Sequence, residues 1–341
     1  MRPVRTVREA RHDDVLHDAD VARGLLPGRA LGEPLAVGLT LLAEGSGGVL
    51  DRRSLSRFGL ASGEIATLVR QGELVRIHRD AYRLPAGVET PQTAFLATVR
   101  AVRQRHPSAV LLGSAAVAEL GLPVFGQPSH VHVAVGSAPN ASGRSVFRSA
   151  ASPPPEQLRA RLSGAVAQPA RACLDAARLD GLVPGVVAAD VALRRGMTTS
   201  AELAAVVATM TGLRGVGRSR QCVELASPQS ESPGESWSAV LLHQHGIMPP
   251  QRQHVIMDDD GVVGRVDFYW PDAGVVGEFD GRVKYGRRNP SGRPPEDVLW
   301  DEKVREDRVR AVGLHVVRWG TPDLHAPARW LRRLRAALGL P

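Results

Sequence analysis

The chain has 341 residues, of which 43% are hydrophobic and 23% are charged, and its formal net charge is +8. This length predicts two or three domains, and the apolar content is sufficient for real hydrophobic cores. The longest apolar runs fall well short of the roughly 18 residues that span a bilayer, and residues 1–30 lack the apolar core of a signal peptide. These features exclude a membrane protein and predict a cytoplasmic one.

The positive charge favours a polyanionic partner, of which nucleic acid is the commonest. An alternative is a genome whose base composition favours Arg, but the charge is distributed unevenly. Residues 282–341 hold fourteen Lys and Arg against seven Asp and Glu. The two cysteines, Cys173 and Cys222, lie in apolar helical patterns without a CxxC neighbour, so they predict small core residues in a reducing compartment and no zinc site.

Residues 1–47 are rich in Arg, Asp and Gly, and only Leu35–Ala43 is apolar. We expect a poorly ordered extension that holds one short helix.

Residues 48–88 read as two helices followed by a two-stranded hairpin. The first helix carries Leu55 and Phe58, and the second begins near Ser62, which we expect to be its N-cap. Two strands, Leu74–Ile77 and Ala81–Leu84, follow. This is the layout of a winged helix-turn-helix, whose second helix enters the major groove and whose hairpin contacts the DNA backbone. The predicted DNA contacts are Thr67, Arg70 and Gln71 on the second helix and Arg76, His78 and Arg79 on the wing.

The same stretch resembles the N-terminal winged helix of AbiEi-like, type IV antitoxins. That resemblance implies DNA binding. The alternative is a winged helix that docks only to proteins, with Arg70 and Arg79 as solvated charges.

Residues 89–226 predict an α+β middle domain without recognisable chemistry. Arg171, Asp175 and Asp190 lie in apolar helical patterns there, and a surface or salt-bridged structural role is favoured over an active site. The predicted helices and strands are Gln92–Arg105, Ser114–Leu120, His130–Val135, Ser145–Arg148, Gln168–Ala177, Val183–Arg195 and Thr199–Met210.

Residues 232–341 predict a last α/β domain with the element order αβββαβ. Its predicted elements are Glu235–His245, Gln253–Met257, Arg265–Trp270, Gly274–Phe279, Glu296–Val312 and Leu314–Trp319, with a terminal helix over Ala326–Leu340.

Acidic residues stand in two of these strands where a buried strand favours Val. Asp267 lies in one strand, and Glu278 and Asp280 share a face of the next because positions two apart point to the same side. Burying several carboxylates together costs several kcal/mol unless a cation compensates them. The pattern therefore predicts a divalent metal with oxygen ligands, Mg²⁺ or Mn²⁺.

The order Glu235, Asp267, Glu278-Phe279-Asp280-Gly281 and Lys284 resembles the PD-(D/E)XK nuclease superfamily, and more narrowly the very-short-patch-repair-like endonuclease domains of actinobacterial proteins. The likeness runs from Ser232 to Leu324. It implies a restriction-endonuclease-like core with Asp267, Glu278 and Glu235 as metal ligands. Asp280 occupies the place of the usual superfamily lysine, so Lys284 or Lys303 is the expected catalytic cation.

The fold class predicted from these patterns is a multi-domain α/β protein. The predicted function is a metal-dependent DNA endonuclease guided to duplex DNA by its winged helix. One alternative is a non-catalytic DNA-binding regulator, antitoxin-like, with a vestigial nuclease domain, and another is an RNA nuclease.

Overall fold

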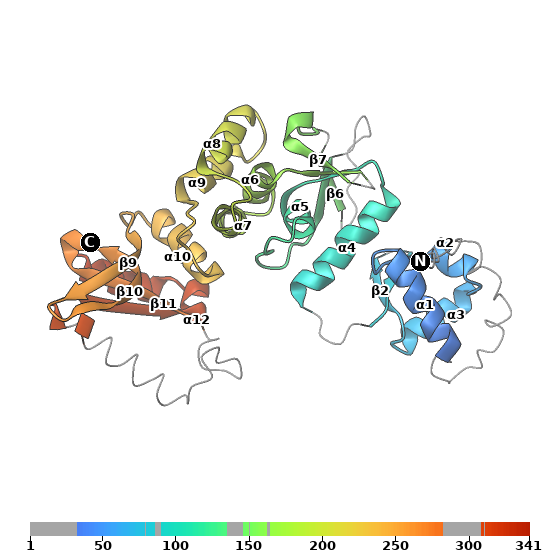
Figure 1. Cartoon of the computed structure of the whole chain (residues 1–341), viewed down its shortest axis with the longest axis horizontal. Coiled ribbons are helices and arrows are strands. Elements are labelled where there is room, and N and C mark those ends of the chain that lie inside the picture. Colours follow the sequence, from blue (N-terminus) through green and yellow to red (C-terminus); the bar gives the residue numbers. More distant parts are fainter. Residues whose placement is uncertain are drawn as a thin grey trace, which may run out of the picture. The chain divides into compact units, whose positions relative to one another are not determined.

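The computed structural model describes residues 33–78, 80–85, 90–134, 146–149, 151–161, 164–281, 308–309 and 311–341 (Figure 1). The protein has a mixed α/β, multi-domain fold with several sheets, as predicted. It divides into two compact units, one of which holds the described residues up to Val110 with Ser129–Ser152 and Ala160–Ala165, and the other the remainder. None of the described helices is long and apolar enough to cross a membrane.

The first unit begins with a winged helix-turn-helix. Its strand β3 lies between β1 and β2, and both pairings are antiparallel. The elements are α1 (Glu33–Gly45), β1 (Leu50–Asp51), α2 (Arg52–Arg57), α3 (Ser62–Arg70), β2 (Val75–His78) and β3 (Ala81–Arg83).

The start of α3 differs from the prediction by one residue. Ala61, whose backbone is extended, is the N-cap of α3, and Ser62 is the first helical residue. The Glu64 carboxylate accepts a hydrogen bond from the Ala61 N–H at 2.7 Å, which is the half of a capping box that the N3 residue supplies. The Ser62 hydroxyl instead accepts a hydrogen bond from the Arg52 guanidinium at 2.6 Å.

Helix α1 is an integral part of the winged-helix core. Leu35, Leu39 and Ala43 recur every four residues and are buried in one cluster with Leu55 and Leu68 of the helix-turn-helix. Only residues 33–47 of the expected N-terminal extension are described, and their one helix packs on the domain that follows. Residues 1–32 lie outside the described residues.

Helix α4 (Pro91–Arg105) is fastened to the winged helix by polar contacts. Thr90 caps its first turn by accepting the Thr93 N–H. The Gln104 amide donates to the carbonyl oxygens of Ser46 and Val49 at 3.0 and 2.8 Å, and α4 packs against β1 and β2. The Arg100 guanidinium donates to the Gly47 carbonyl at 2.9 Å. The C-terminal end of α4 therefore has a fixed position beside the winged helix.

Short strands follow α4. Strands β5 (Val131–Ala134) and β6 (Val146–Ser149) pair in parallel. The sheet order is β6-β5-β4-β8-β7, with β4 at Val110–Leu111, β7 at Leu158–Ala160 and β8 at Ala165–Ala167.

The second unit opens with packed helices around a buried charge network. The Asp175 carboxylate is fully buried between two guanidinium groups, with the Arg171 Nε at 2.9 Å and the Arg178 Nε at 2.5 Å. This arrangement is the salt-bridged role predicted for Arg171 and Asp175. The helices are α5 (Gly113–Glu119), α6 (Pro169–Leu179), α7 (Leu182–Arg194), α8 (Ser200–Thr209) and α9 (Val216–Leu225), the last of which was expected only as a helical pattern around Cys222.

The second unit ends in a four-stranded sheet of order β12-β11-β10-β9. Strands β9 to β11 are antiparallel, and β12 runs parallel to β11. Most of the helix predicted at 296–312 lies outside the described residues. The predicted terminal helix Ala326–Leu340 is α13, which runs from Ala328 to Ala337, and the short helix α12 before it was not predicted. The elements are α10 (Pro233–Gln244), β9 (Gln251–Asp258), β10 (Gly261–Trp270), β11 (Val275–Asp280), β12 (His315–Gly320), α12 (Thr321–His325) and α13 (Ala328–Ala337).

An aromatic core lies between this sheet and helices α10, α12 and α13. The Trp319 ring stacks on Phe268 and on Trp330, with centroid distances of 5.5 and 4.4 Å. Gly277 makes this packing possible, because a Cβ there would lie 2.6 Å from the Trp319 ring.

Candidate nucleic-acid interface and acidic centre

The predicted DNA contacts on α3 lie together on its outer side. Arg70 and Gln71 are exposed, whereas Ile65 and Leu68 on the opposite side are buried. The Arg70 guanidinium donates to the Thr67 hydroxyl at 2.9 Å. This contact orients one cationic and one polar side chain toward the same solvent-facing surface, which an approaching base edge or phosphate could contact.

The wing places its polar residues at the tip of the β2–β3 hairpin. The exposed Arg76 donates through Nε to the His78 carbonyl at 3.4 Å. Asp80 adopts a left-handed backbone conformation with φ of 61°, which allows the tight turn. The predicted contact Arg79 lies outside the described residues.

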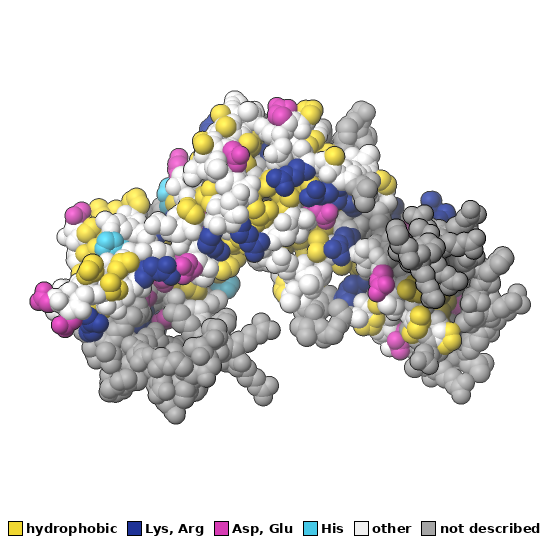
Figure 2. All heavy atoms as spheres, in the orientation of Figure 1, with side chains coloured by type: hydrophobic (Ala, Val, Ile, Leu, Met, Phe, Trp, Pro, Cys, Tyr) yellow, Lys and Arg dark blue, Asp and Glu magenta, His cyan; other side chains and the backbone are white. Residues whose placement is uncertain are grey.

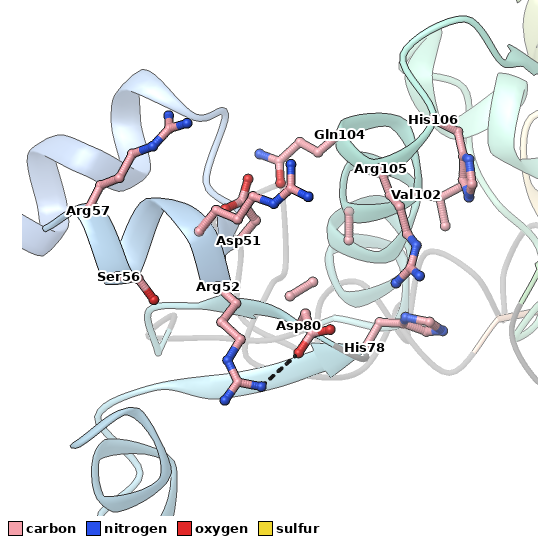
Figure 3. Close-up of a pocket in the computed structure, with 13 residues that line it drawn as sticks. Asp51, Arg52, Ser56, Arg57, His78, Asp80, Val102, Gln104, Arg105 and His106 are labelled. Atoms are coloured by element: carbon pink, nitrogen blue, oxygen red, sulfur yellow. Dashed lines mark hydrogen bonds and ion pairs between the residues drawn. The ribbon is translucent and has the colours of Figure 1, made fainter. Parts of the chain in front are cut away.

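A cleft of about 730 Å³ lies beside the wing (Figure 3). Helix α2, the wing tip and the C-terminal end of α4 form its walls, and the buried residues Ala81, Ala101 and Val102 are part of its lining. Its polar lining consists of Asp51, Arg52, Arg53, Ser56, Arg57, His78, Asp80, Gln104, Arg105 and His106.

Both carboxylates of the cleft are engaged by neighbouring groups. Asp51 is the N-cap of α2 and accepts the Ser54 N–H at 2.7 Å. Asp80 accepts from the Arg52 guanidinium at 3.3 Å, an interaction drawn as a dashed line in Figure 3. The lining holds four arginines and two histidines against these two acids, so the cleft carries a net positive charge.

The predicted acidic centre lies on the C-terminal sheet and includes a row of polar residues on four adjacent strands. Arg318 of β12 pairs with Glu278 of β11 in the strand register. Asp267 of β10 follows one step beyond the Phe268–Gly277 pair and so stands opposite Glu278. On β9, Gln253 occupies the place opposite Asp267.

Two of the predicted acids meet at the Gln253 side chain. Its amide nitrogen donates to the Glu235 Oε2 at 2.9 Å and to the Asp267 Oδ1 at 3.1 Å. The other oxygen of Asp267 accepts the Phe279 N–H at 2.8 Å. The structure therefore brings Glu235 and Asp267 together through one shared donor.

Glu235 also has a local structural role. Ser232 is the N-cap of α10 and its hydroxyl donates to Glu235 Oε1 at 2.7 Å, while the Glu231 N–H donates to Oε2 at 2.9 Å. This exchange resembles a capping box, which explains an acid at this position without any chemistry.

Arg318 supplies the positive charge next to the remaining acids. Its guanidinium lies 3.0 Å from the Glu278 carboxylate and 3.9 Å from that of Asp280. The predicted cations Lys284 and Lys303 lie outside the described residues. Within the part of the chain that the structure describes, no group of three His, Cys, Asp or Glu side chains is arranged to hold a metal ion.

Gln253 and Arg318 were not among the residues predicted from the sequence. Arg318 lies two residues after Val316 in an alternating strand, a spacing that could have placed it on the Glu278 face. Gln253 could not have been found from the pattern, because its backbone has a positive φ of 53° within a strand.

Buried polar residues connect the base of α10 to its neighbours. Asp190 accepts the Ser227 N–H and the Ser236 hydroxyl at 2.8 and 2.7 Å. Burial raises the pKa of Asp190 above its usual range, although these hydrogen bonds and Arg252 act in the opposite direction. Arg252 donates to the Leu225 carbonyl at 2.9 Å, so this cluster has a structural explanation.

Comparison with known proteins bears on the N-terminal part. Residues 39–85, from α1 through β3, match a family described as "Transcriptional regulator, AbiEi antitoxin". This part of the chain is therefore similar to an AbiEi antitoxin-like transcriptional regulator domain, the family that its sequence resembles. The match does not reach the C-terminal sheet.

Two relatives from Mycobacterium tuberculosis are called Uncharacterized protein Rv2248, in strain ATCC 25618 / H37Rv, and Uncharacterized protein MT2308, in strain CDC 1551 / Oshkosh. Each is 31% identical over 121 residues, a match that covers 35% of this chain and 45% of the relative. The chain thus spans less than half the length of these relatives. The crystal structure of the RV2827C protein from Mycobacterium tuberculosis superposes with a TM-score of 0.35 at 16% identity, over 68% of this chain and 91% of that one.

Proposed function

We propose that the protein is a DNA-binding regulator of the AbiEi antitoxin type, with the winged helix as its DNA-reading part. The observation that carries this proposal is that the matched residues, 39–85, form one folded winged helix that runs from α1 through β3. The outer side of α3 carries Thr67, Arg70 and Gln71 in the position from which a recognition helix reads the major groove.

The test is a selection of duplex DNA from a random library by the full-length protein, followed by fluorescence anisotropy with the enriched sequence. We expect specific binding that Arg70→Gln and Gln71→Ala weaken at particular base positions, by about 1–3 kcal/mol for each base contact removed. The control is Arg220→Gln, since Arg220 is an exposed arginine of α9 in the other unit. Absence of any enriched duplex would overturn the proposal.

A second candidate function is phosphodiester hydrolysis by the C-terminal sheet. The observation that favours it is the shared Gln253 donor between Glu235 and Asp267, with Glu278 on the adjacent strand. Carboxylate oxygens are the ligands that Mg²⁺ and Mn²⁺ prefer, so Asp267, Glu278 and Glu235 are the candidate ligands, although the described part of the chain does not arrange three such side chains around one point. A bound ion there would supply an activated water and offset charge on the phosphate.

Arg318 would contribute to this reaction as a fixed positive charge beside Glu278, in a region where the usual superfamily lysine is replaced by Asp280. The test is incubation of supercoiled DNA, linear DNA and RNA with Mg²⁺ or Mn²⁺. Cleavage that Asp267→Asn and Glu278→Gln abolish supports this function. If DNA is bound but not cleaved, the result excludes hydrolysis, and of the two proposed functions only the regulator function remains.

A further inference from the structure

We infer that the cleft between α2, the wing tip and α4 holds a stretch of the DNA sugar-phosphate backbone. The inference rests on the proposed regulator function and adds a second contact surface, which includes a helix outside the segment that matches the regulator family. Three features of the cleft support it: its position, its uncompensated charge and its rigidity.

The contacts of Arg52 show that the cleft lies beside the two elements proposed to contact DNA. The Arg52 guanidinium contacts Asp80 at the wing tip at 3.3 Å and the hydroxyl of Ser62, the first residue of α3, at 2.6 Å. One side chain of the cleft wall thus joins the wing to the start of the recognition helix. A duplex read by α3 and touched by the wing must pass this edge of the cleft, where backbone phosphates flank the groove.

The charge is available for a phosphate. Arg53, Arg57 and Arg105 make no ion pair with any residue that the structure describes, whereas the cleft carboxylates Asp51 and Asp80 already have donors. In Figure 3, the Arg105 side chain extends from the end of α4 toward His78 and Asp80 of the wing. Guanidinium groups recognise phosphate oxygens through two parallel hydrogen bonds, so they suit this ligand better than a single ammonium does.

The rigidity comes from α4. The Gln104 amide holds two carbonyl oxygens at the α1–β1 connection, and the neighbouring Arg105 therefore projects from a fixed helix end. Little conformational entropy of the backbone is lost when such a side chain binds a phosphate. On the face seen in Figure 2, the described Arg side chains are spread over the surface rather than gathered in one patch.

Salt dependence distinguishes this contact from base reading. The logarithm of the binding constant falls with the logarithm of the salt concentration, and removing one phosphate contact reduces the steepness of this fall by about 0.9 for duplex DNA. We expect Arg53→Gln and Arg105→Gln each to reduce the steepness by this amount, and the double variant by about twice as much. The reduction should be equal for the selected duplex and for a scrambled one. Arg70→Gln changes the preference between these two duplexes, and Arg220→Gln changes neither quantity.

The experiment uses the full chain, fluorescence anisotropy and a series of NaCl concentrations. Circular dichroism confirms that each variant is folded, which is expected because the substituted side chains lie at the protein surface. Slopes for Arg53→Gln and Arg105→Gln that equal the wild-type slope would overturn the inference and leave the regulator function intact. If the wild-type protein binds no duplex at all, the proposed function itself fails.

Discussion

Leu39 tests whether α1 belongs to the winged-helix core. Its side chain is 0% exposed, whereas Leu41, two residues later in the same helix, is 54% exposed. Replacing a fully buried Leu by Ala removes apolar contacts and leaves a cavity, at a cost of about 2–5 kcal/mol. The same change at Leu41 should alter the free energy of unfolding by less than about 0.5 kcal/mol. Both variants shorten the same side chain in the same helix, so helix propensity cancels.

The assay separates the two units by their probes. All five tryptophans lie at or after position 237, so tryptophan fluorescence reports on the second unit, and far-UV circular dichroism reports on both. We expect Leu39→Ala to lower the first unit's melting temperature by on the order of 10 °C or more, without moving the fluorescence transition. Equal melting curves for the two variants would refute the assignment of α1 to the core.

Three further predictions concern the second unit. Burial raises the pKa of Asp190, so the folded protein binds a proton at this carboxyl more tightly than the unfolded chain does. The contribution of Asp190 to the free energy of unfolding is therefore complete below the pKa of this group in the unfolded chain, and it is lost as the pH rises through the raised pKa of the folded protein. Urea unfolding followed from about pH 4, the ordinary pKa of an aspartate, toward higher pH should therefore show a fall in stability that Asp190→Asn flattens. Parallel pH profiles of the two proteins would contradict this. Gly277→Ala should destabilise the aromatic core, so the tryptophan fluorescence transition should occur at a lower temperature. Gly217→Ala should not shift this transition, because a Cβ at position 217 meets nothing within 4 Å. Burial raises the pKa of the Cys173 thiol to about 12, and it also raises the pKa of Cys222. Neither cysteine should therefore react with a disulfide reagent at pH 8 until urea unfolds the chain. Rapid labelling of the native protein would disprove that packing.

Local patterns predicted much of the fold. The helix expected at Thr199–Met210, the strand expected at Arg265–Trp270 and the helix-turn-helix all depend on residues close in sequence, and the structure contains each of them. A helical pattern was expected around Cys222, but the bounds of helix α9 were not predicted, because its sequence, VGRSRQCVEL, buries only Ser219 and Cys222 and so lacks a clear apolar stripe.

The candidate sites were less accessible to sequence reasoning because they depend on long-range contacts. The cleft joins α2 to the end of α4, roughly fifty residues later, and the Arg318 pairing with Glu278 crosses a parallel strand pair. Patterns indicated which acids to examine, but not that Gln253 would supply the donor shared by two of them. Such partners become visible only when the strand register is known.

The most direct test of the account compares two double variants for affinity to the selected duplex in the absence of divalent metal. One removes the α3 contacts, Arg70→Gln with Gln71→Ala, and the other removes acids of the sheet, Asp267→Asn with Glu278→Gln. If the winged helix carries DNA recognition, the first loses its preference for the selected over a scrambled duplex and the second retains it. Retention in the first variant and loss in the second would contradict the account.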